Sequence, residues 1–102
     1  MPKGEKADSF RLYNMFETRG HLADLAGLGI VAQRRLEAKL RDYVYPILRQ
    51  NPNSGSNIKR LKNWDPPTWR YRAGDWRFFY EIDEKQRIVS MTAADHRNAP
   101  YR

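Results

Sequence analysis

The feature that most constrains the fold of this sequence is a series of three strand-like segments in its C-terminal half. Residues 69–73, 76–83 and 87–94 are rich in aromatic and β-branched residues. Gly74-Asp75 separates the first two segments, and Glu84-Lys85 lies between the last two. Both connections are short enough for tight hairpins. The sequence therefore predicts an antiparallel meander of three strands.

The N-terminal half predicts one strand and two helices. Residues 10–16 carry apolar and aromatic side chains on both sides of an extended chain, which is typical of a strand covered on both faces. Residues 18–26 fit a short helix that ends at the turn formed by residues 27–29. From Ile30, apolar residues recur every three or four positions and predict the longest helix. Because Pro46 removes a backbone hydrogen bond, we expect this helix to kink or end near Tyr45.

These elements together predict an α+β fold, in which a sheet of about four strands has helices on one face. A chain of 102 residues can bury one core, so we expect a flexible extension over residues 1–9 and a single domain over residues 10–102. The absence of cysteine excludes disulfides, thiolate nucleophiles and iron–sulfur clusters. No metal-binding motif, phosphate-binding glycine loop, signal peptide or long apolar run is present. We therefore expect a soluble, cytoplasmic protein with no metal, no cofactor and no membrane partner.

The charge of the chain favours an anionic partner. There are 19 Lys and Arg against 12 Asp and Glu, a formal net charge of +7. The excess is sharpest over residues 59–77, where six basic residues stand against two acidic ones. Such a surface indicates nucleic acid, an acidic protein or anionic lipid as the partner. A solvated basic surface with no partner is the alternative.

The first hairpin predicts where this charge gathers. A two-residue turn at Gly74-Asp75 places Arg72 opposite Arg77, and the alternation of side chains puts Arg70 on the same face. Like charges directly opposite each other in a sheet repel. A cluster of three arginines therefore costs stability unless an anion lies over it.

Extending the same register predicts a histidine beside the arginines. A tight turn at Glu84-Lys85 pairs Arg77 with Thr92 and places His96 on the arginine face. A bulge or a slip of one residue exchanges His96 for Arg97, and a hydrogen-bonded histidine at a strand end is the structural alternative. His21, near the first helix, is interpreted as structural or solvent-exposed.

The aromatic residues divide into two groups. Trp76, Phe78 and Tyr80 alternate within one strand, as core residues do. Trp64 and Trp69 flank the loop at residues 65–67, and for these two both core packing and stacking on nucleic-acid bases remain open.

Several segments resemble the RelE/ParE superfamily of toxins from bacterial toxin–antitoxin systems. These are residues 58–62, residues 69–83, the Asp95-His96-Arg97 run and the Tyr101-Arg102 pair, and the resemblance extends over about residues 10–102. It implies the RelE/ParE-like microbial ribonuclease fold. RelE-like members cleave mRNA in the ribosomal A site, whereas ParE-like members inhibit DNA gyrase without nuclease activity. An inactive, toxin-like binding module is a third possibility.

The resemblance also implies a type II toxin that inhibits translation as a metal-independent endoribonuclease, an mRNA interferase. In this mechanism the ribose 2′-hydroxyl attacks the adjacent phosphorus and leaves a 2′,3′-cyclic phosphate. Arginine guanidinium groups would stabilise the transition state, a histidine would transfer protons, and a tyrosine would stack on a base or share that transfer. The catalytic residues implied are Arg77, His96, Arg97 and Tyr101, and the RNA-binding or phosphate-binding residues are Arg70, Arg72, Lys59, Arg60 and Lys62.

The partners implied by the resemblance are a cognate acidic antitoxin, mRNA in the ribosomal A site and ribosomal RNA. Operator DNA would be bound only through the antitoxin complex. Some RelE-like toxins carry lysines where this chain has Arg70 and Arg72. Because an arginine stays protonated, these two residues are expected to anchor the RNA backbone rather than to move protons.

Overall fold

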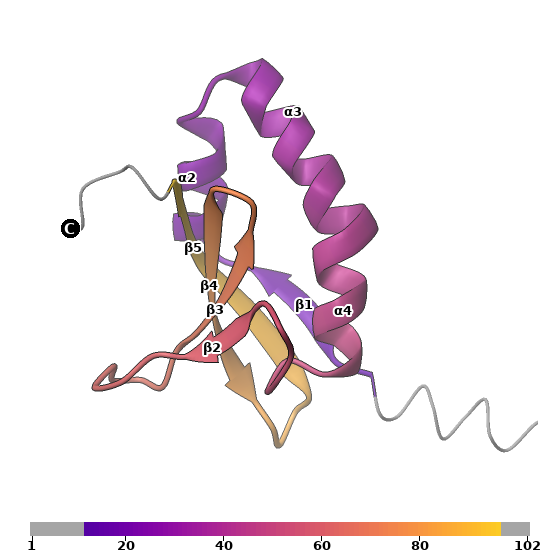
Figure 1. Cartoon of the computed structure of the whole chain (residues 1–102), viewed down its shortest axis with the longest axis vertical. Coiled ribbons are helices and arrows are strands. Elements are labelled where there is room, and N and C mark those ends of the chain that lie inside the picture. Colours follow the sequence, from indigo (N-terminus) through magenta and orange to yellow (C-terminus); the bar gives the residue numbers. More distant parts are fainter. Residues whose placement is uncertain (1–11, 97–102) are drawn as a thin grey trace, which may run out of the picture.

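A computed structural model describes residues 12–96 and shows one long helix packed against a twisted, mixed sheet (Figure 1). The sheet has five strands in the order β1-β5-β4-β3-β2. In chain order the elements are β1 (Asn14–Glu17), α2 (Arg19–Ala26), α3 (Ile30–Lys39), η1 (Leu40–Val44), α4 (Tyr45–Gln50), β2 (Ile58–Arg60), β3 (Trp69–Ala73), β4 (Trp76–Asp83) and β5 (Ile88–His96). The predicted α+β class and C-terminal meander are confirmed.

Two strands at the edges of the sheet differ from the prediction. The sheet gains a fifth strand, β2, which is short and charged and therefore lacks an alternating apolar pattern. At the other edge, β1 runs parallel to β5. Met15 of β1 packs against the core, but Phe16 is 57% exposed, so the expectation that this strand is covered on both faces was wrong. Phe10, which the predicted strand included, lies outside the described residues.

The long helix continues through Pro46 by changing its hydrogen-bonding pattern. Residues of η1 form a π-helical turn directly before α4, and the Tyr45 N–H donates to the carbonyl oxygen of Leu40, five residues earlier. Pro46 then occupies the first turn of α4, where a missing N–H is tolerated. Of the two outcomes expected near Tyr45, a kink or an end, the helix does not end there; instead its regular α-helical pattern is interrupted directly before Tyr45, because the wider turn absorbs the proline. None of the helices in residues 12–96 is long and apolar enough to cross a membrane.

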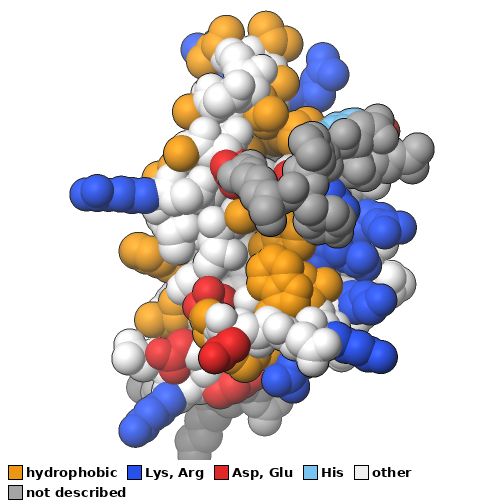
Figure 2. Space-filling model, turned by 90° about the vertical axis from the view of Figure 1, so that its left-hand side faces the viewer, with side chains coloured by type: hydrophobic (Ala, Val, Ile, Leu, Met, Phe, Trp, Pro, Cys, Tyr) orange, Lys and Arg blue, Asp and Glu red, His pale blue; other side chains and the backbone are white. Residues whose placement is uncertain are grey.

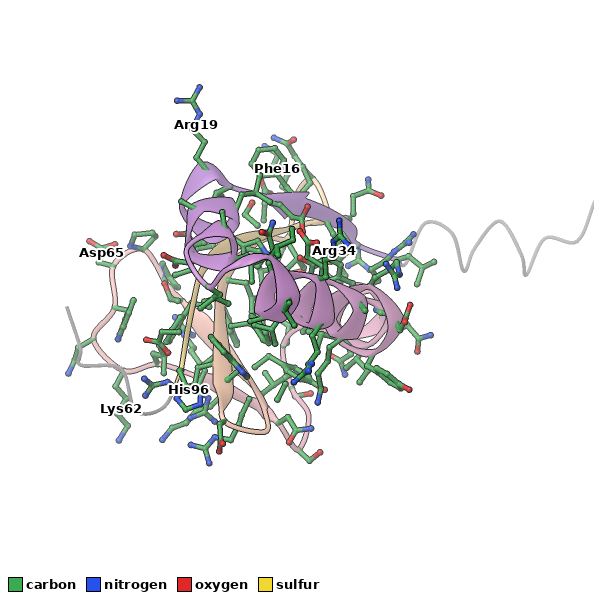
Figure 3. All side chains as sticks on the ribbon, turned by 90° about the horizontal axis from the view of Figure 1, so that it is seen from above. Phe16, Arg19, Arg34, Lys62, Asp65 and His96 are labelled. Carbon is green, nitrogen blue, oxygen red and sulfur yellow. The ribbon has the colours of Figure 1, made fainter. Side chains whose placement is uncertain are left out.

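The core lies between the helices and one face of the sheet. Thr18 caps the N-terminus of α2 as its hydroxyl accepts from the His21 N–H, which begins this helix where the sequence predicted. Seen from above, the loop that carries Lys62 and Asp65 extends away from the long helix (Figure 3). The buried apolar residues shared by both layers are Tyr13, Leu25, Leu36, Leu40, Val44, Leu48, Tyr71, Ala73, Phe78, Tyr80, Val89, Met91 and Ala94.

Candidate functional site

The sheet face opposite the helices carries a group of basic side chains, which we call the basic face: Lys59, Arg70, Arg72 and Arg77. Lys59 of β2 lies opposite Arg70 of β3, and Arg72 lies opposite Arg77 of β4. The Gly74 turn, where φ is +60°, joins the two strands in the predicted register. The predicted cluster of three arginines is therefore present, and β2 adds a lysine to it.

Asp95 is the residue on this face that the sequence analysis missed. It lies opposite Arg77 on the neighbouring strand, and the Arg77 Nε donates to its Oδ1 at 2.8 Å. The Arg77 Nη2 also donates to the carbonyl oxygen of His96 at 3.3 Å. With side chains only 11% and 18% exposed, Arg77 and Asp95 form a largely desolvated ion pair. Such a charge-assisted contact fixes the orientation of the guanidinium group.

The ion pair also changes the electrostatic interpretation of the cluster. The sequence predicted that three arginines need an external anion, but Asp95 supplies one carboxylate from within the chain. The balance on this face of the described strands still favours positive charge. Four basic residues, Lys59, Arg70, Arg72 and Arg77, share it with three acidic residues, Asp95, Glu81 and Asp83. The face is therefore internally organised and remains suited to an anion.

His96 does not share the face of Arg77, so the predicted register of β5 was wrong. His96 lies opposite Trp76, and its ring meets the Trp76 ring edge-on with centroids 5.0 Å apart. Its Nε2 is 3.9 Å from the Oδ2 of Asp75 in the hairpin turn. His96 lines a separate hollow of about 300 Å³ between the sheet and α2. The histidine lies at the end of the sheet, on the other side from Arg77.

A β-bulge explains the different register. The turn after β4 spans the four residues 84–87, whereas the prediction allowed two. This difference shifts the pairing of β5 by an even number of positions, so by itself it leaves each β5 side chain on its predicted face. Phe79 pairs with Ala93 and Tyr80 with Met91, so Thr92 is the extra residue of a bulge. One extra residue exchanges the two faces of the strand beyond it. The bulge is therefore the alternative raised in the sequence analysis, in which Arg97 takes the place of His96 on the arginine face. Arg97 itself lies outside the described residues.

The remaining predicted site residues are not all brought together. Arg60 lies over the Trp69 ring, 5.3 Å from its centroid, at a strand position that faces away from Lys59 and Arg70. Lys62 is exposed on the loop after β2 (Figure 3). Tyr101, like Arg97, lies outside the described residues. Among residues 12–96 no group of three His, Cys, Asp or Glu side chains is arranged to hold a metal ion.

Two aromatic rings cover the middle of the same sheet face. Phe79 lies opposite Arg70, and Trp64 from the loop between β2 and β3 stacks on it with centroids 5.8 Å apart and ring planes at 12°. Trp64 remains 48% exposed. The loop is closed at its base, where the Leu61 N–H donates to the Thr68 carbonyl oxygen. Viewed from this side, basic side chains run along one flank of a prominent hydrophobic patch (Figure 2).

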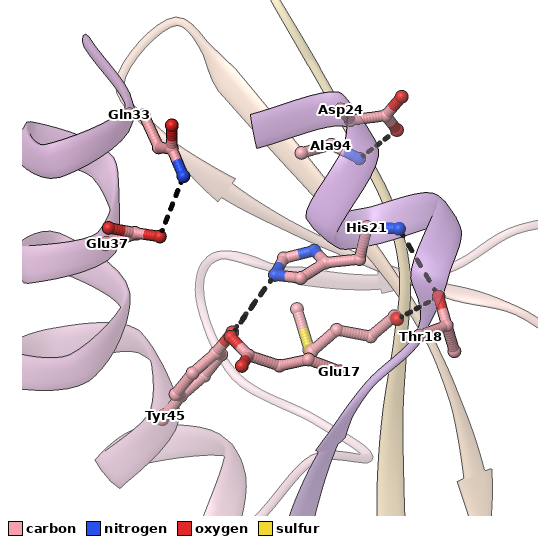
Figure 4. Close-up of polar contacts among 9 residues, drawn as sticks. Glu17, Thr18, His21, Asp24, Gln33, Glu37, Tyr45 and Ala94 are labelled. Carbon is pink, nitrogen blue, oxygen red and sulfur yellow. Dashed lines mark hydrogen bonds and ion pairs between the residues drawn. The ribbon is translucent and has the colours of Figure 1, made fainter. Parts of the chain in front are cut away.

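His21 belongs to a separate polar cluster on the helix side of the molecule (Figure 4). Its ring is fully buried, with Nε2 3.1 Å from the Tyr45 hydroxyl and 3.6 Å from the Glu17 carboxylate. Tyr45 in turn donates to Glu17 at 2.6 Å. Burial lowers the pKa of His21 and, with the Glu17 carboxylate, raises the pKa of Tyr45. This histidine therefore connects α2 to the long helix, which confirms its structural interpretation.

Comparison with known proteins identifies the family. Residues 18–101 match the family described as the ParE toxin of type II toxin–antitoxin system, parDE. The chain therefore belongs to this family of toxins, within the RelE/ParE superfamily. No curated protein matches the chain.

Solved structures share the fold. The toxin–antitoxin complex RelBE2 from Mycobacterium tuberculosis contains a chain that is 25% identical, with a TM-score of 0.67 over 84% of this chain and 99% of that one. The RelE–RelB complex from the archaeon Pyrococcus horikoshii gives 21% identity and a TM-score of 0.61, covering 87% and 99% of the two chains. The YoeB/ParE toxin from Agrobacterium tumefaciens is 17% identical, with a TM-score of 0.63 over 81% of this chain and 96% of that one.

Proposed function

We propose that this toxin acts as a ribosome-dependent mRNA endoribonuclease that inhibits translation. The observation that carries the proposal is the fixed Arg77 guanidinium beside Arg72 on an accessible face of the sheet. Guanidinium groups held in place before the substrate arrives stabilise developing phosphate charge without a cost of reorganisation. RNA cleavage builds such charge on the oxygens of the scissile phosphate.

The reaction needs no metal ion. The ribose 2′-oxygen loses its proton and attacks the adjacent phosphorus, and the bond to the 5′-oxygen breaks as that oxygen gains a proton. The products are a 2′,3′-cyclic phosphate and a 5′-hydroxyl. Arg77 and Arg97 would bind the phosphate, while Arg70, Arg72 and Lys59 would anchor the neighbouring backbone.

The proton-transfer roles fall on His96, Arg97 and Tyr101. Because His96 faces Trp76, it would act from the end of the sheet rather than from within the row of arginines. Tyr101 would share the proton transfer or stack on a base. Arg60, which lies over the Trp69 ring, and Lys62, on the exposed loop after β2, are not part of the basic face and would contact RNA at the periphery.

Inhibition of DNA gyrase is a second candidate, and two observations favour it. The matching family is described as a ParE toxin, and His96 lies apart from the arginines. A gyrase inhibitor would use the basic face for contact only. A toxin-like module without activity remains a third candidate.

Induction of the protein in cells distinguishes the candidates. Primer extension on cellular mRNA would show cuts at A-site codons for the ribonuclease. Intact mRNA with a DNA-damage response would identify the gyrase inhibitor and overturn the proposal. Normal growth without any antitoxin would indicate the inactive module.

We further propose an acidic antitoxin as the cognate partner, located with this toxin in the cytoplasm. Two of the three solved structures described above are toxin–antitoxin complexes, and the net charge of +7 suits an acidic segment. Operator DNA would be bound through the antitoxin. Co-expression with the product of a neighbouring short acidic reading frame should restore growth, and failure of every such frame to do so would contradict this partner.

A further inference from the structure

We infer that the hollow beside Trp64 is a nucleobase subsite that accepts a base with an amino group. The hollow has a volume of about 150 Å³, and its lining includes both rings of the Trp64–Phe79 pair and two acidic residues, Asp24 and Asp95. This inference rests on the proposed ribonuclease function, because it assigns the base next to the scissile phosphate to this place.

The ring pair has the properties of a stacking platform. One side of Trp64 contacts Phe79, and nearly half of the Trp64 surface is exposed. A large exposed aromatic ring usually finds cover in a ligand or partner. Single-stranded RNA presents unstacked bases, and proteins bind such bases on aromatic rings.

The position of the platform matches the length of one nucleotide. Phe79 lies two residues from Arg77 along β4, so the two side chains leave the same face about 7 Å apart. Arg70 lies directly opposite Phe79 on β3. A phosphate held by Arg77 or Arg70 therefore leaves its own base within reach of Trp64. Each nucleotide joins a flat ring to an anion at this spacing, and RNA is the substrate of the proposed function, which is why we assign RNA.

The polar wall of the hollow selects among the bases. Ionised carboxylates only accept hydrogen bonds. Asp24 already accepts from the Ala94 N–H at 3.0 Å, and Asp95 accepts from Arg77, so both carboxylates are held in place. Guanine, adenine and cytosine present amino groups, whereas uracil has no amino group and offers a single ring N–H between two carbonyl oxygens on its pairing edge. The subsite should therefore disfavour uracil.

The test uses the full-length protein and fluorescein-labelled RNA pentanucleotides with 2′-O-methyl groups, which block cleavage. Four probes differ only in the central base, and a fifth lacks that base. Fluorescence anisotropy should show weaker binding of the uracil and abasic probes than of the other three. Trp64→Ala should weaken binding of the amino-bearing probes about tenfold and remove the preference. Trp64→Phe should retain most of the binding of the amino-bearing probes and most of the base preference.

Two further variants make the test specific. Tyr43→Ala removes another exposed aromatic, on the opposite, helical layer, and should leave binding unchanged. Asp24→Asn keeps an oxygen for the Ala94 N–H but adds an amide donor, so it should shift the preference toward uracil. Equal binding of all five probes, or binding of none, overturns the inference.

Cleavage mapping separates this inference from the proposed function. If cellular mRNA is cut and Trp64→Ala leaves the base preference at the cut sites unchanged, the subsite is wrong while the ribonuclease function stands. If mRNA stays intact but the probes bind as expected, the ribonuclease function fails and the base subsite stands. If Trp64→Ala weakens antitoxin binding and not RNA binding, the platform docks a protein and the inference is overturned.

Discussion

The molecule has two polar regions that differ in the balance of their charges. The His21 cluster, on the helix side, consists of Glu17, His21 and Tyr45, and the basic face lies on the other side of the sheet. In the His21 cluster a buried imidazole and a hydroxyl meet one carboxylate, all from the chain itself. On the basic face, basic residues outnumber acidic residues, and Lys59 and Arg72 are exposed. Polar groups that satisfy one another stabilise a fold, whereas an excess of one charge on an exposed face suits a ligand. Substitutions on the basic face should therefore change activity, and substitutions in the His21 cluster should change stability.

The largest expected effect is the loss of activity on removing Arg77. Arg77→Ala should reduce mRNA cleavage, and with it toxicity, by about 100-fold or more, the range observed when one preorganised donor to a transition state is lost. Primer extension at matched protein levels measures this. Antitoxin binding should be largely retained, which shows that the variant folds.

A second variant controls for the carboxylate that Arg77→Ala leaves behind. Asp95 is only 18% exposed, so its unpaired charge would itself destabilise the fold. The double variant Arg77→Ala/Asp95→Ala removes both charges and should be as inactive as the single variant. Full toxicity of either variant would show that Arg77 is not part of the site.

Removing the Tyr45 hydroxyl should affect stability and not chemistry. Its one proton goes to Glu17, so the Nε2–H of His21 is the donor to the hydroxyl oxygen. Tyr45→Phe removes this acceptor and leaves the fully buried Nε2 with only the Glu17 carboxylate, 3.6 Å away, which should lower the free energy of unfolding by about 1–3 kcal/mol. Urea unfolding measures the change, and cleavage per folded molecule should stay at the wild-type level.

The matched control for this change is Tyr43→Phe. Tyr43 lies two residues away and is 67% exposed. Loss of its hydroxyl should change stability by no more than about 0.5 kcal/mol. Equal effects of the two substitutions would show that the His21 cluster contributes nothing specific.

A pH dependence of smaller size should come from the same cluster. Burial lowers the pKa of His21 below its ordinary value of 6.5, against the opposing effect of Glu17 on β1 and Asp24 on α2. As pH falls through 6.5 the unfolded chain binds a proton that the folded chain does not, so the free energy of unfolding decreases. Urea unfolding between pH 7.5 and pH 5.5 should show this slope, and His21→Gln should flatten it. Equal slopes in the two proteins would contradict this assignment.

The sequence predicted best those parts of the fold that depend on local pattern. The bounds of β3 and β4 and the pairing of Arg72 with Arg77 follow from alternating side chains and one glycine turn. β2 escaped prediction because its three residues form a strand only by pairing with β3, and two of them are charged. A strand defined by its neighbour leaves no periodic signal.

The candidate site was predicted only as far as the bulge. The arginines lie on β3 and β4, whose pairing contains no bulge, and were placed correctly. His96 follows the Thr92 bulge of β5 and was assigned to the wrong face. A bulge adds one residue and requires no particular residue type at this position, so it leaves no signal in the sequence. In the structure the Thr92 hydroxyl donates a hydrogen bond to the Phe79 carbonyl oxygen. Asp95 was missed for the same reason, because its role as the partner of Arg77 depends on that register.

The smallest expected effect concerns Arg72, and it tests whether the basic face contacts the RNA backbone. Each phosphate contact releases about 0.7 counterion when it binds single-stranded RNA, so the logarithm of affinity falls with the logarithm of salt concentration. Arg72→Ala should reduce this slope by about 0.7 for the 2′-O-methyl pentanucleotides, while leaving the ranking of the central bases unchanged. Arg34→Ala removes an equally exposed charge from the long helix and should leave the slope unchanged. If both substitutions change the slope equally, RNA responds to net charge alone, and the arrangement of the basic face has no special part in binding.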